Sequence, residues 1–220
     1  WFWLGLYRNR AKRYFVQTRS MMRLAEERLG GRAICAPIVP ESVICPDVPL
    51  GGRSLRFDFL YVASGEAHKN HRALISAWAI LAAEGIYPSL ALTLASEDAP
   101  ELAALVAAEC ASKHLHIHNL GRFPHDRLFE VYRDSGALIY PSSFESFGLP
   151  LIEARSAGLA VLASELDYVR DITDPEETFD PRSSLSIARA VKRYMKRSDA
   201  TIEPLAVGEF LEQVTQRPVP

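Results

Sequence analysis

The middle of the chain alternates short apolar runs with longer segments in which apolar residues recur every three or four positions. The short runs are rich in aliphatic and aromatic side chains and are predicted to form strands at 57–63, 90–95, 114–118, 137–140 and 160–163. The longer segments are predicted to form helices at 70–84, 99–112, 125–135, 148–157, 183–196 and 202–213. Strands that alternate with helices at this spacing indicate βαβ units and a parallel sheet covered on both faces. Because crossovers between parallel strands are right-handed, we expect an α/β fold with a doubly wound, Rossmann-like sheet.

The first 45 residues fit this pattern less well. They contain a predicted strand at 14–17, a predicted helix at 19–29 and a second predicted strand at 33–39. Prolines and a glycine pair follow, which is typical of an irregular linker. We therefore expect the end of a preceding domain, a hinge, a complete domain, and a C-terminal helix with a tail, at 1–45, 46–53, 54–200 and 201–220. The chain begins with Trp1, so we expect it to be a piece of a longer protein.

The composition is that of a folded globular protein: 48% of the 220 residues are hydrophobic and 24% are charged, which excludes disordered, collagen-like and coiled-coil chains. The net charge of −2 lacks the excess of Lys and Arg that nucleic-acid binding requires. No uncharged apolar run of the sequence reaches the roughly 18 residues of a membrane span. The three cysteines show no metal-ligand spacing, and their odd number favours a reducing compartment, so we expect a cytoplasmic protein.

Ligands of open parallel sheets bind beyond the carboxyl ends of the strands, so the segments that follow the predicted strands are the candidate sites. The first such segment runs from Ser64 to Asn70 and opens into a helix. Gly65 allows a tight turn, Asn70 can cap the helix, and Lys69 adds a cation where the helix dipole is positive. This combination suits an oligophosphate, although the spacing is neither that of a Walker loop nor that of a dinucleotide fingerprint. A solvated surface lysine is the alternative interpretation.

The segment after the fourth predicted strand carries two carboxylates, Glu145 in a loop and Glu153 about one turn into the next helix. Gly148 begins that helix, and Pro150 lies in its first turn, where proline is tolerated. Carboxylates beside a helix N-terminus accept hydrogen bonds from vicinal hydroxyls, so a sugar or a ribose is a natural ligand. The alternative is that both glutamates only complement the helix dipole.

The motif Ser-Ser-x-Glu-x-Phe-Gly-Leu-Pro-x-x-Glu-Ala, with a strand before it and a helix after it, resembles the signature of the retaining nucleotide-sugar glycosyltransferases of family 4. The likeness extends over 14–212 and includes Lys69, the segments 120–123 and 162–164, and the Glu145–Glu153 pair. It implies the GT-B fold, of which this chain is the C-terminal, donor-binding domain. The sequence around Lys69 is similar to bacterial enzymes that build surface polysaccharides such as O-antigen.

The resemblance also implies the site residues. It makes Glu145 and Lys69 the catalytic residues, with a nucleoside-diphosphate sugar as the donor and no further cofactor. It assigns donor binding to Ser64, Gly65, Lys69, Gly121, Phe123, Glu145, Phe147, Gly148, Leu149 and Glu153. Lys69 neutralises the diphosphate, while Glu145 and the backbone N–H groups of 147–149 hold the transferred sugar and its phosphates. Glu153 takes the ribose hydroxyls, and the loop at 121–123 borders the base.

One position departs from the family pattern. The family commonly has an Arg five residues before the Lys as a second cation for the diphosphate, and Ser64 stands there in this chain. A serine donates one hydrogen bond but supplies no charge. Either the helix dipole with His68 or Arg72 compensates, or the donor is held more weakly.

The reaction that the resemblance implies stabilises a departing nucleoside diphosphate and an oxocarbenium-like sugar, mostly by electrostatic positioning. The acceptor, a glycan or a lipid-linked glycan held mostly by the first domain, attacks from the face that the leaving group vacates. No enzyme nucleophile is then required, in contrast to double-displacement glycosidases. The Asp-x-Asp metal motif of the other major transferase fold is missing from the sequence, so a metal-independent reaction with no metal-binding residues is expected.

Several other groups are assigned structural roles. His114, His116 and His118 alternate along a predicted strand, but no carboxylate or Cys completes a metal-ligand set nearby, so a partly exposed strand face is favoured. Trp78 is expected in the core and Cys110 as a buried small hydrophobe.

A basic cluster late in the chain is formed by Lys192, Arg193, Lys196 and Arg197. It suits a peripheral contact with a membrane that bears a lipid-linked acceptor. A solvated helix face is the favoured alternative.

Other function classes stay open. They are a GT-B nucleotide-sugar epimerase or phosphorylase, a non-catalytic module that binds sugar nucleotides, and a doubly wound protein without a sugar role. A phosphorylase needs a pyridoxal-binding Lys context, which the sequence does not show. We expect the chain alone to fold and bind a nucleoside diphosphate but to transfer sugar poorly.

Overall fold

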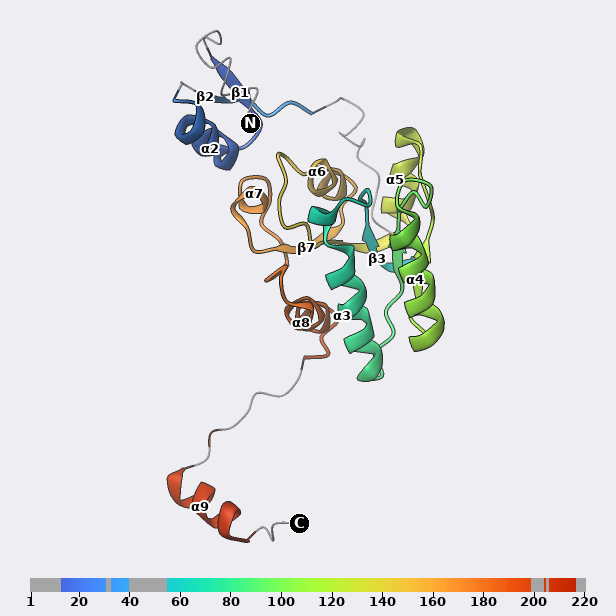
Figure 1. Ribbon diagram of the computed structural model, residues 1–220, viewed down its shortest axis with the longest axis vertical. Coiled ribbons are helices and arrows are strands. Elements are labelled where there is room, and N and C mark those ends of the chain that lie inside the picture. The colour runs from blue at the N-terminus through green and yellow to red at the C-terminus, as the bar shows by residue number, and fades with distance from the viewer. Residues whose placement is uncertain (1–12, 31–32, 40–54, 199–203, 205, 217–220) are drawn as a thin grey trace.

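A computed structural model of the chain describes residues 13–30, 33–39, 55–198, 204 and 206–216 (Figure 1). The predicted hinge at 46–53 lies outside the described residues, as do 201–203, 205 and 217–220 of the expected tail, so the expected division into domains stays a prediction.

The centre of the structure is a six-stranded sheet in which every neighbouring pair of strands is parallel. Its strands are β3 (Phe57–Tyr61), β4 (Leu90–Leu92), β5 (Ile117–Asn119), β6 (Ser135–Tyr140), β7 (Ala160–Ser164) and β8 (Glu177–Phe179). They lie in the order β5-β4-β3-β6-β7-β8. Numbered within this sheet, the order is 3-2-1-4-5-6, which is that of the Rossmann fold and reverses direction between β3 and β6. The predicted doubly wound α/β sheet is confirmed, with β8 as a strand that the sequence analysis did not include.

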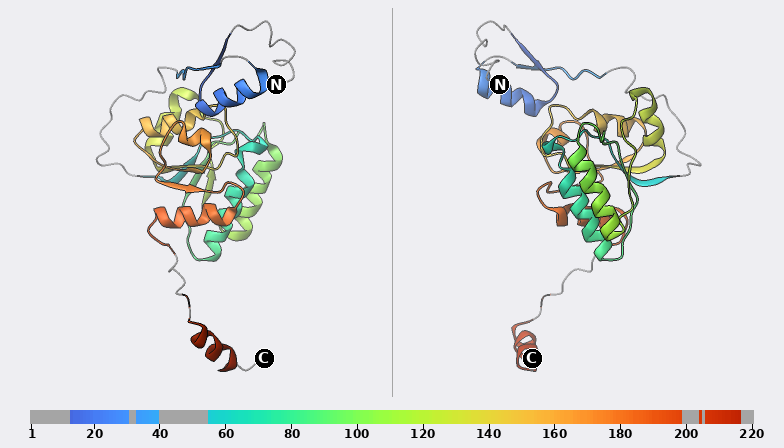
Figure 2. Two further views of the ribbon diagram at one scale, coloured as in Figure 1. Left: turned by 90° about the vertical axis from the view of Figure 1, so that its left-hand side faces the viewer. Right: turned by 45° about the vertical axis from the view of Figure 1, so that its right-hand side comes forward.

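Helices cover both faces of this sheet (Figures 1 and 2). They are α3 (His71–Ala83), α4 (Pro100–Lys113), α5 (His125–Arg133), α6 (Leu149–Ser156), α7 (Asp167–Arg170) and α8 (Ser184–Tyr194). Helix α3 packs against α4 and α8, whereas α5 packs against α6. This arrangement buries the sheet on both faces, which explains why the strand sequences read as continuous apolar runs instead of alternating ones.

The core lies on both faces of the sheet, and its largest buried side chain belongs to α3. Trp78 of α3 is 1% exposed, packs edge-on against Phe59 of β3, and donates a hydrogen bond from Nε1 to the Pro88 carbonyl at 2.8 Å. The expected core position of Trp78 is therefore confirmed. Cys110 is half-buried instead of buried, because it faces the edge strand β5 near the rim of the core.

A smaller βαβ unit precedes the main sheet. Strands β1 (Tyr14–Val16) and β2 (Ala33–Cys35) pair in parallel and are joined by helix α2 (Arg19–Leu29). Thr18 caps this helix by accepting a hydrogen bond from the Met21 amide. The unit also contacts the main domain, since the Ser20 amide and hydroxyl donate to the Asp171 carboxylate at 2.7 and 2.6 Å.

The third predicted strand is shifted along the chain. Helix α4 continues to Lys113, and His114 ends it in the left-handed conformation with φ of 54°. The strand β5 begins only at Ile117, so His118 is the one member of the histidine triplet that lies in a strand. The prediction that His114, His116 and His118 share one strand face is therefore wrong.

The late basic cluster does not form one solvated face. Lys192 is buried and pairs with Glu84 of α3 at 2.7 Å, while Arg193 binds Glu177 of β8 at 2.6 Å. Lys196 and Arg197 are exposed. The last described helix, α9 (Val207–Gln216), begins five residues later than predicted. Among the described helices, none combines the length and the hydropathy that a membrane span requires.

Candidate functional site

The loops that follow β3 and β6 meet where the sheet reverses direction. The Ser143 amide and hydroxyl in the second loop donate to the His68 carbonyl in the first, at 2.8 and 3.1 Å. Asn70 strengthens the junction, because its side-chain Nδ2 donates to the carbonyls of Pro141 at 3.1 Å and of Pro181 at 2.6 Å. Asn70 was expected to cap α3 with its side chain. It instead sits at the helix N-cap with φ of 61° and uses its amide to join the loops after β6 and β8.

Lys69 and Glu145 form the polar centre of this junction. Lys69 ends the short 3-10 turn η3 (Ala67–Lys69), and its Nζ lies 2.7 Å from Glu145 Oε1. Both side chains are mostly buried, with exposed fractions of 16% and 10%. The structure therefore brings together the two residues to which the resemblance gives a catalytic role, although they are 76 positions apart in the sequence.

Two neutral donors also bind the same carboxylate oxygen. Tyr140 OH donates to Glu145 Oε1 at 2.9 Å, and Ser142 Oγ donates to it at 2.7 Å. Burial and the charge of Glu145 hold the pKa of Tyr140 far above its usual value, so this phenol stays protonated and remains a donor. Within the described part of the chain, the other oxygen, Oε2, has no hydrogen-bond partner.

Glu153 lies in a different environment. It is only 3% exposed, and its Oε2 accepts a hydrogen bond from the fully buried Tyr132 at 2.7 Å. Burial, together with the nearby carboxylate, raises the pKa of Tyr132 well above its usual range. The two glutamates thus flank the start of α6 as predicted, but one lies at the site edge and the other is enclosed.

The sequence analysis did not identify the tyrosines that hold these glutamates. Tyr132 and Tyr140 stand in predicted helix and strand segments, where aromatic residues are ordinarily explained by packing. The available signal is that Tyr140 ends a buried strand directly before the acidic motif, where a phenol needs a polar partner.

The N-terminus of α6 is shaped by a glycine. Gly148 is the N-cap with φ of 82°, a left-handed conformation that costs a residue with a side chain about 1–2 kcal/mol. Pro150 lies in the first helical turn, as predicted. Phe147 is buried beside this turn, and Leu149 is the first helical residue. Gly148 provides no side-chain cap, Pro150 has no N–H, and the Leu151 amide donates to the Gly148 carbonyl at 3.0 Å, so the Leu149 amide is left to other acceptors.

The two residues at the start of the first loop differ from expectation. Ser64 is exposed, and its hydroxyl donates to the Glu66 carboxylate. Gly65 does not adopt a positive φ, so it is not required for a tight turn. It is required because a Cβ at this position would overlap the Cβ of Ala99, which precedes α4.

The loop after β5 also lies at the carboxyl edge of the sheet. Gly121 has φ of 74°, and its amide donates to Asn119 Oδ1 at 3.2 Å. Phe123 packs partly buried against the core. Arg122 between them forms ion pairs with Asp98 and Glu97 of the loop after β4. The described residues contain no group of three or more His, Cys, Asp or Glu side chains arranged to hold a metal ion.

A parallel sheet in Rossmann order, with a cation and a carboxylate at its reversal point, places the chain in the class of doubly wound α/β domains. The chain belongs to the family described as "Glycosyl transferases group 1", which matches residues 53–205.

Two curated relatives come from Escherichia coli. The chain is 28% identical over 160 residues to O-antigen chain mannosyltransferase B, covering 71% of this chain and 41% of the relative. It is 30% identical over 138 residues to serotype-specific mannosyltransferase WbdA, covering 61% of this chain and 17% of the relative. The chain thus spans less than half the length of these relatives.

Solved structures share the fold. Sucrose-phosphate synthase from Thermosynechococcus elongatus superposes with a TM-score of 0.69 at 20% identity, covering 84% of this chain and 49% of that one. Anabaena Alr3699/HepE in complex with UDP and glucose superposes with a TM-score of 0.69 at 14% identity, covering 89% of this chain and 56% of that one. These likenesses show that the chain has the fold of one half of a GT-B glycosyltransferase.

Proposed function

We propose that this chain is the donor-binding part of a retaining, metal-independent glycosyltransferase. In this proposal it moves a hexose from a nucleoside-diphosphate sugar to a glycan or lipid-linked acceptor during polysaccharide synthesis. The observation that carries the proposal is the Lys69–Glu145 pair, 2.7 Å apart at the point where the sheet reverses direction. The names of the relatives make mannose the first sugar to test and an O-antigen-like glycan the first acceptor.

Lys69 is proposed to bind the donor diphosphate. Its ammonium is mostly buried and faces one carboxylate, so a diphosphate that enters the site offers it a second, more highly charged partner. The N-terminus of α6 adds amides and the positive end of its dipole near the same loop. Together these groups would stabilise the charge that develops on the leaving nucleoside diphosphate.

Glu145 is proposed to hold the transferred sugar without attacking it. Its Oε1 already accepts hydrogen bonds from Lys69, Tyr140 and Ser142, and an oxygen with three donors is a weak nucleophile. Its Oε2 is available to sugar hydroxyls, and a fixed carboxylate can also stabilise an oxocarbenium-like sugar. The proposal therefore assigns Glu145 to positioning and charge stabilisation, in a retaining reaction in which the enzyme supplies no covalent nucleophile.

The remaining donor contacts follow from the positions of the loops. The amides of 147–149 would bind the sugar and its phosphates, and the loop at 121–123 would border the base. Glu153 is proposed to bind ribose hydroxyls while it keeps its hydrogen bond to Tyr132. Its burial requires the ribose to reach it at the first turn of α6.

The test is calorimetric titration of the 220-residue chain with GDP, UDP and ADP. Lys69→Ala should weaken binding about tenfold or more, because a hydrogen bond to a charged group contributes about 1.5–3 kcal/mol. Lys113→Ala is the matched control, since Lys113 is half-exposed and pairs with Glu109 at the far end of α4. No binding by the unaltered chain, or equal binding by both variants, would refute the proposed donor site. If the chain binds a nucleoside diphosphate as expected, product analysis with a longer protein that contains this chain would establish whether the configuration at the anomeric carbon is retained.

A second candidate is a sugar-nucleotide-binding module that does not catalyse transfer. The observation in its favour is Ser64, which lacks a charge and donates its hydroxyl to Glu66 instead of facing the site. If donor binding is weak for this reason, Ser64→Arg should strengthen binding of the diphosphate. Transfer by the longer protein would exclude this candidate, whereas binding without transfer would support it.

A further inference from the structure

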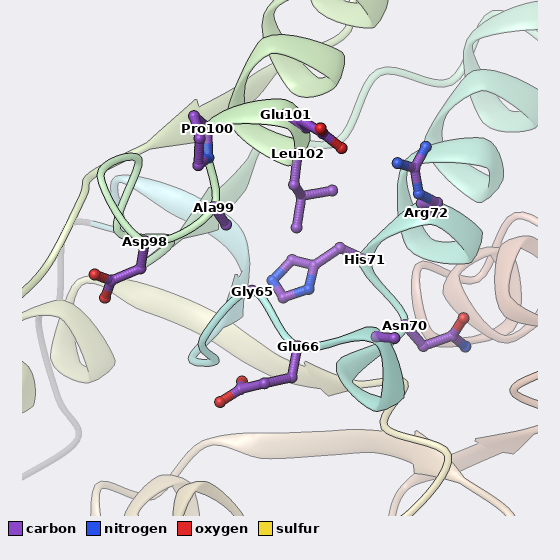
Figure 3. Close-up of a pocket in the computed structure, with 11 residues that line it drawn as sticks. Gly65, Glu66, Asn70, His71, Arg72, Asp98, Ala99, Pro100, Glu101 and Leu102 are labelled. Atoms are coloured by element: carbon purple, nitrogen blue, oxygen red, sulfur yellow. The ribbon is translucent and has the colours of Figure 1, made fainter.

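A separate cavity lies on the other side of the loop that carries Lys69. It has a volume of about 510 Å³ and is lined by residues 65–67, 70–72 and 98–102 (Figure 3). Its walls are the loop after β3 and the N-terminal ends of α3 and α4. Neither Lys69 nor Glu145 lines it. Its volume falls within the range of about 300–1,000 Å³ that is typical of small-molecule sites.

The floor of this cavity contains an unsatisfied histidine. His71 is 3% exposed, and neither of its ring nitrogens has a hydrogen-bond partner. Figure 3 shows its imidazole pointing from α3 into the centre of the cavity, toward Leu102 of α4. On its other side the ring contacts Tyr61, with ring centroids 4.8 Å apart. Buried polar groups without partners are rare in folded proteins, so this ring is a candidate for a hydrogen bond to a molecule that enters the cavity.

The charge of the cavity disfavours an anion as that ligand, even though Arg122 pairs with Asp98 at its rim. Burial first, and then the charge of Lys69, lower the pKa of His71 to about 4, so the imidazole is neutral at pH 7. Carboxylates of Glu66, Asp98 and Glu101 surround the cavity, whereas Arg72 is the only cation among the lining residues. A phosphate would meet this negative rim, despite the two helix N-termini.

The same groups match a molecule that carries hydroxyls. A neutral imidazole offers one donor and one acceptor, and a hydroxyl likewise both donates and accepts. The rim carboxylates are further acceptors for hydroxyl groups. Pro100, Ala99 and the buried Leu102 supply an apolar wall for the C–H face of a sugar ring.

We infer that the cavity between the N-termini of α3 and α4 binds a neutral saccharide unit, with His71 as its central hydrogen-bonding residue. The cavity shares Gly65 with the residues assigned to the donor, but neither Lys69 nor Glu145 lines it, and the inference does not rest on the proposed function. In an enzyme that handles glycans, such a site would hold a sugar of the glycan chain away from the reacting atoms.

The test follows the ring signals of His71 by NMR while methyl α-mannopyranoside or methyl α-glucopyranoside is added to the 220-residue chain. We expect the His71 signals to shift and saturate in the millimolar range, while those of the exposed His116 stay unchanged. Inorganic phosphate is the comparison probe and should leave the His71 signals unmoved. No shift with either glycoside at tens of millimolar, or a shift with phosphate alone, would overturn the inference.

Matched variants locate the binding. Glu101→Gln and His71→Phe should each weaken glycoside binding at least tenfold, whereas Glu109→Gln on the same helix and His116→Phe should not. Because His71→Phe alters a buried residue, the Glu101→Gln result and the ring signals of the unaltered chain decide the outcome if that variant does not fold. Binding that is lost in Lys69→Ala but retained in both cavity variants would place the sugar at the donor site and refute the inference.

Discussion

The hydrogen bond from Tyr140 to Glu145 gives a direct test of how the site is held together. Tyr140→Phe removes one of the three donors on Glu145 Oε1 and keeps the ring that packs edge-on against Tyr61, with centroids 5.8 Å apart. Tyr140 is 0% exposed, so water cannot replace its hydroxyl without a rearrangement. A hydrogen bond to a charged group contributes about 1.5–3 kcal/mol, and the ring's packing contribution is unchanged. We therefore expect the variant to lose about 1.5–3 kcal/mol of unfolding free energy.

Urea denaturation followed by circular dichroism measures this loss at pH 7. The control is Tyr87→Phe. Tyr87 is 48% exposed, so loss of its hydroxyl should change the free energy of unfolding by less than about 0.5 kcal/mol. Adding Glu145→Gln completes a double-mutant cycle, which should show coupling between the two positions. Equal stabilities for the two phenylalanine variants, or a coupling energy near zero, would refute the assignment of Tyr140 as a residue that positions Glu145.

Three further outcomes test features of the same edge of the sheet. Gly65→Ala should destabilise the fold by about 1–3 kcal/mol through overlap with Ala99, and the double variant with Ala99→Gly should recover most of this in urea denaturation. Gly148→Ala should lower the free energy of unfolding by about 1–2 kcal/mol, because alanine disfavours φ of 82°. Thermal unfolding measures this loss, and Gly208→Ala is the control because a Cβ at that position has no atom within 4 Å. The folded pKa of His71, about 4, lies below its ordinary value of 6.5, so its contribution to stability is present above pH 6.5 and is lost as the pH falls toward 4. Stability measured between these pH values should fall less steeply in His71→Phe, and an unchanged slope would contradict the low pKa.

The alternation of apolar runs and helical segments was sufficient to predict the sheet, because a parallel sheet buried on both faces leaves a clear signature in sequence. The prediction of individual elements from this pattern failed where tertiary contacts override the local preference of the sequence. Strand β8 has only three residues, of which Glu177 and Thr178 are polar, so no apolar run marks it. The strand predicted at 114–118 begins only at Ile117, because His114 caps α4 in a left-handed conformation that the apolar pattern does not indicate.

The site was predictable in its components but not in its geometry. The motif places Glu145 and Glu153 on either side of a helix start, and the topology brings Lys69 to the first of them. No local pattern, however, indicates that Tyr132 encloses Glu153 or that Gly65 is present because Ala99 approaches it. Both facts depend on packing between segments that are distant in the sequence.

The side-chain amide of Asn70 joins three separate stretches of chain, since it follows directly after Lys69 and donates to carbonyls beyond β6 and β8. A side chain outside the Lys69–Glu145 pair therefore helps to set the distance between that ammonium and a carboxylate in the loop after β6, and the same residue lines the cavity between α3 and α4. Affinity at the Lys69–Glu145 pair could therefore be altered by a substitution outside the pair. Asn70→Gly would keep the left-handed backbone conformation and would remove the hydrogen bonds to the carbonyls of Pro141 and Pro181. The rigidity of the junction between these loops could thus be changed without altering the charged groups that it holds.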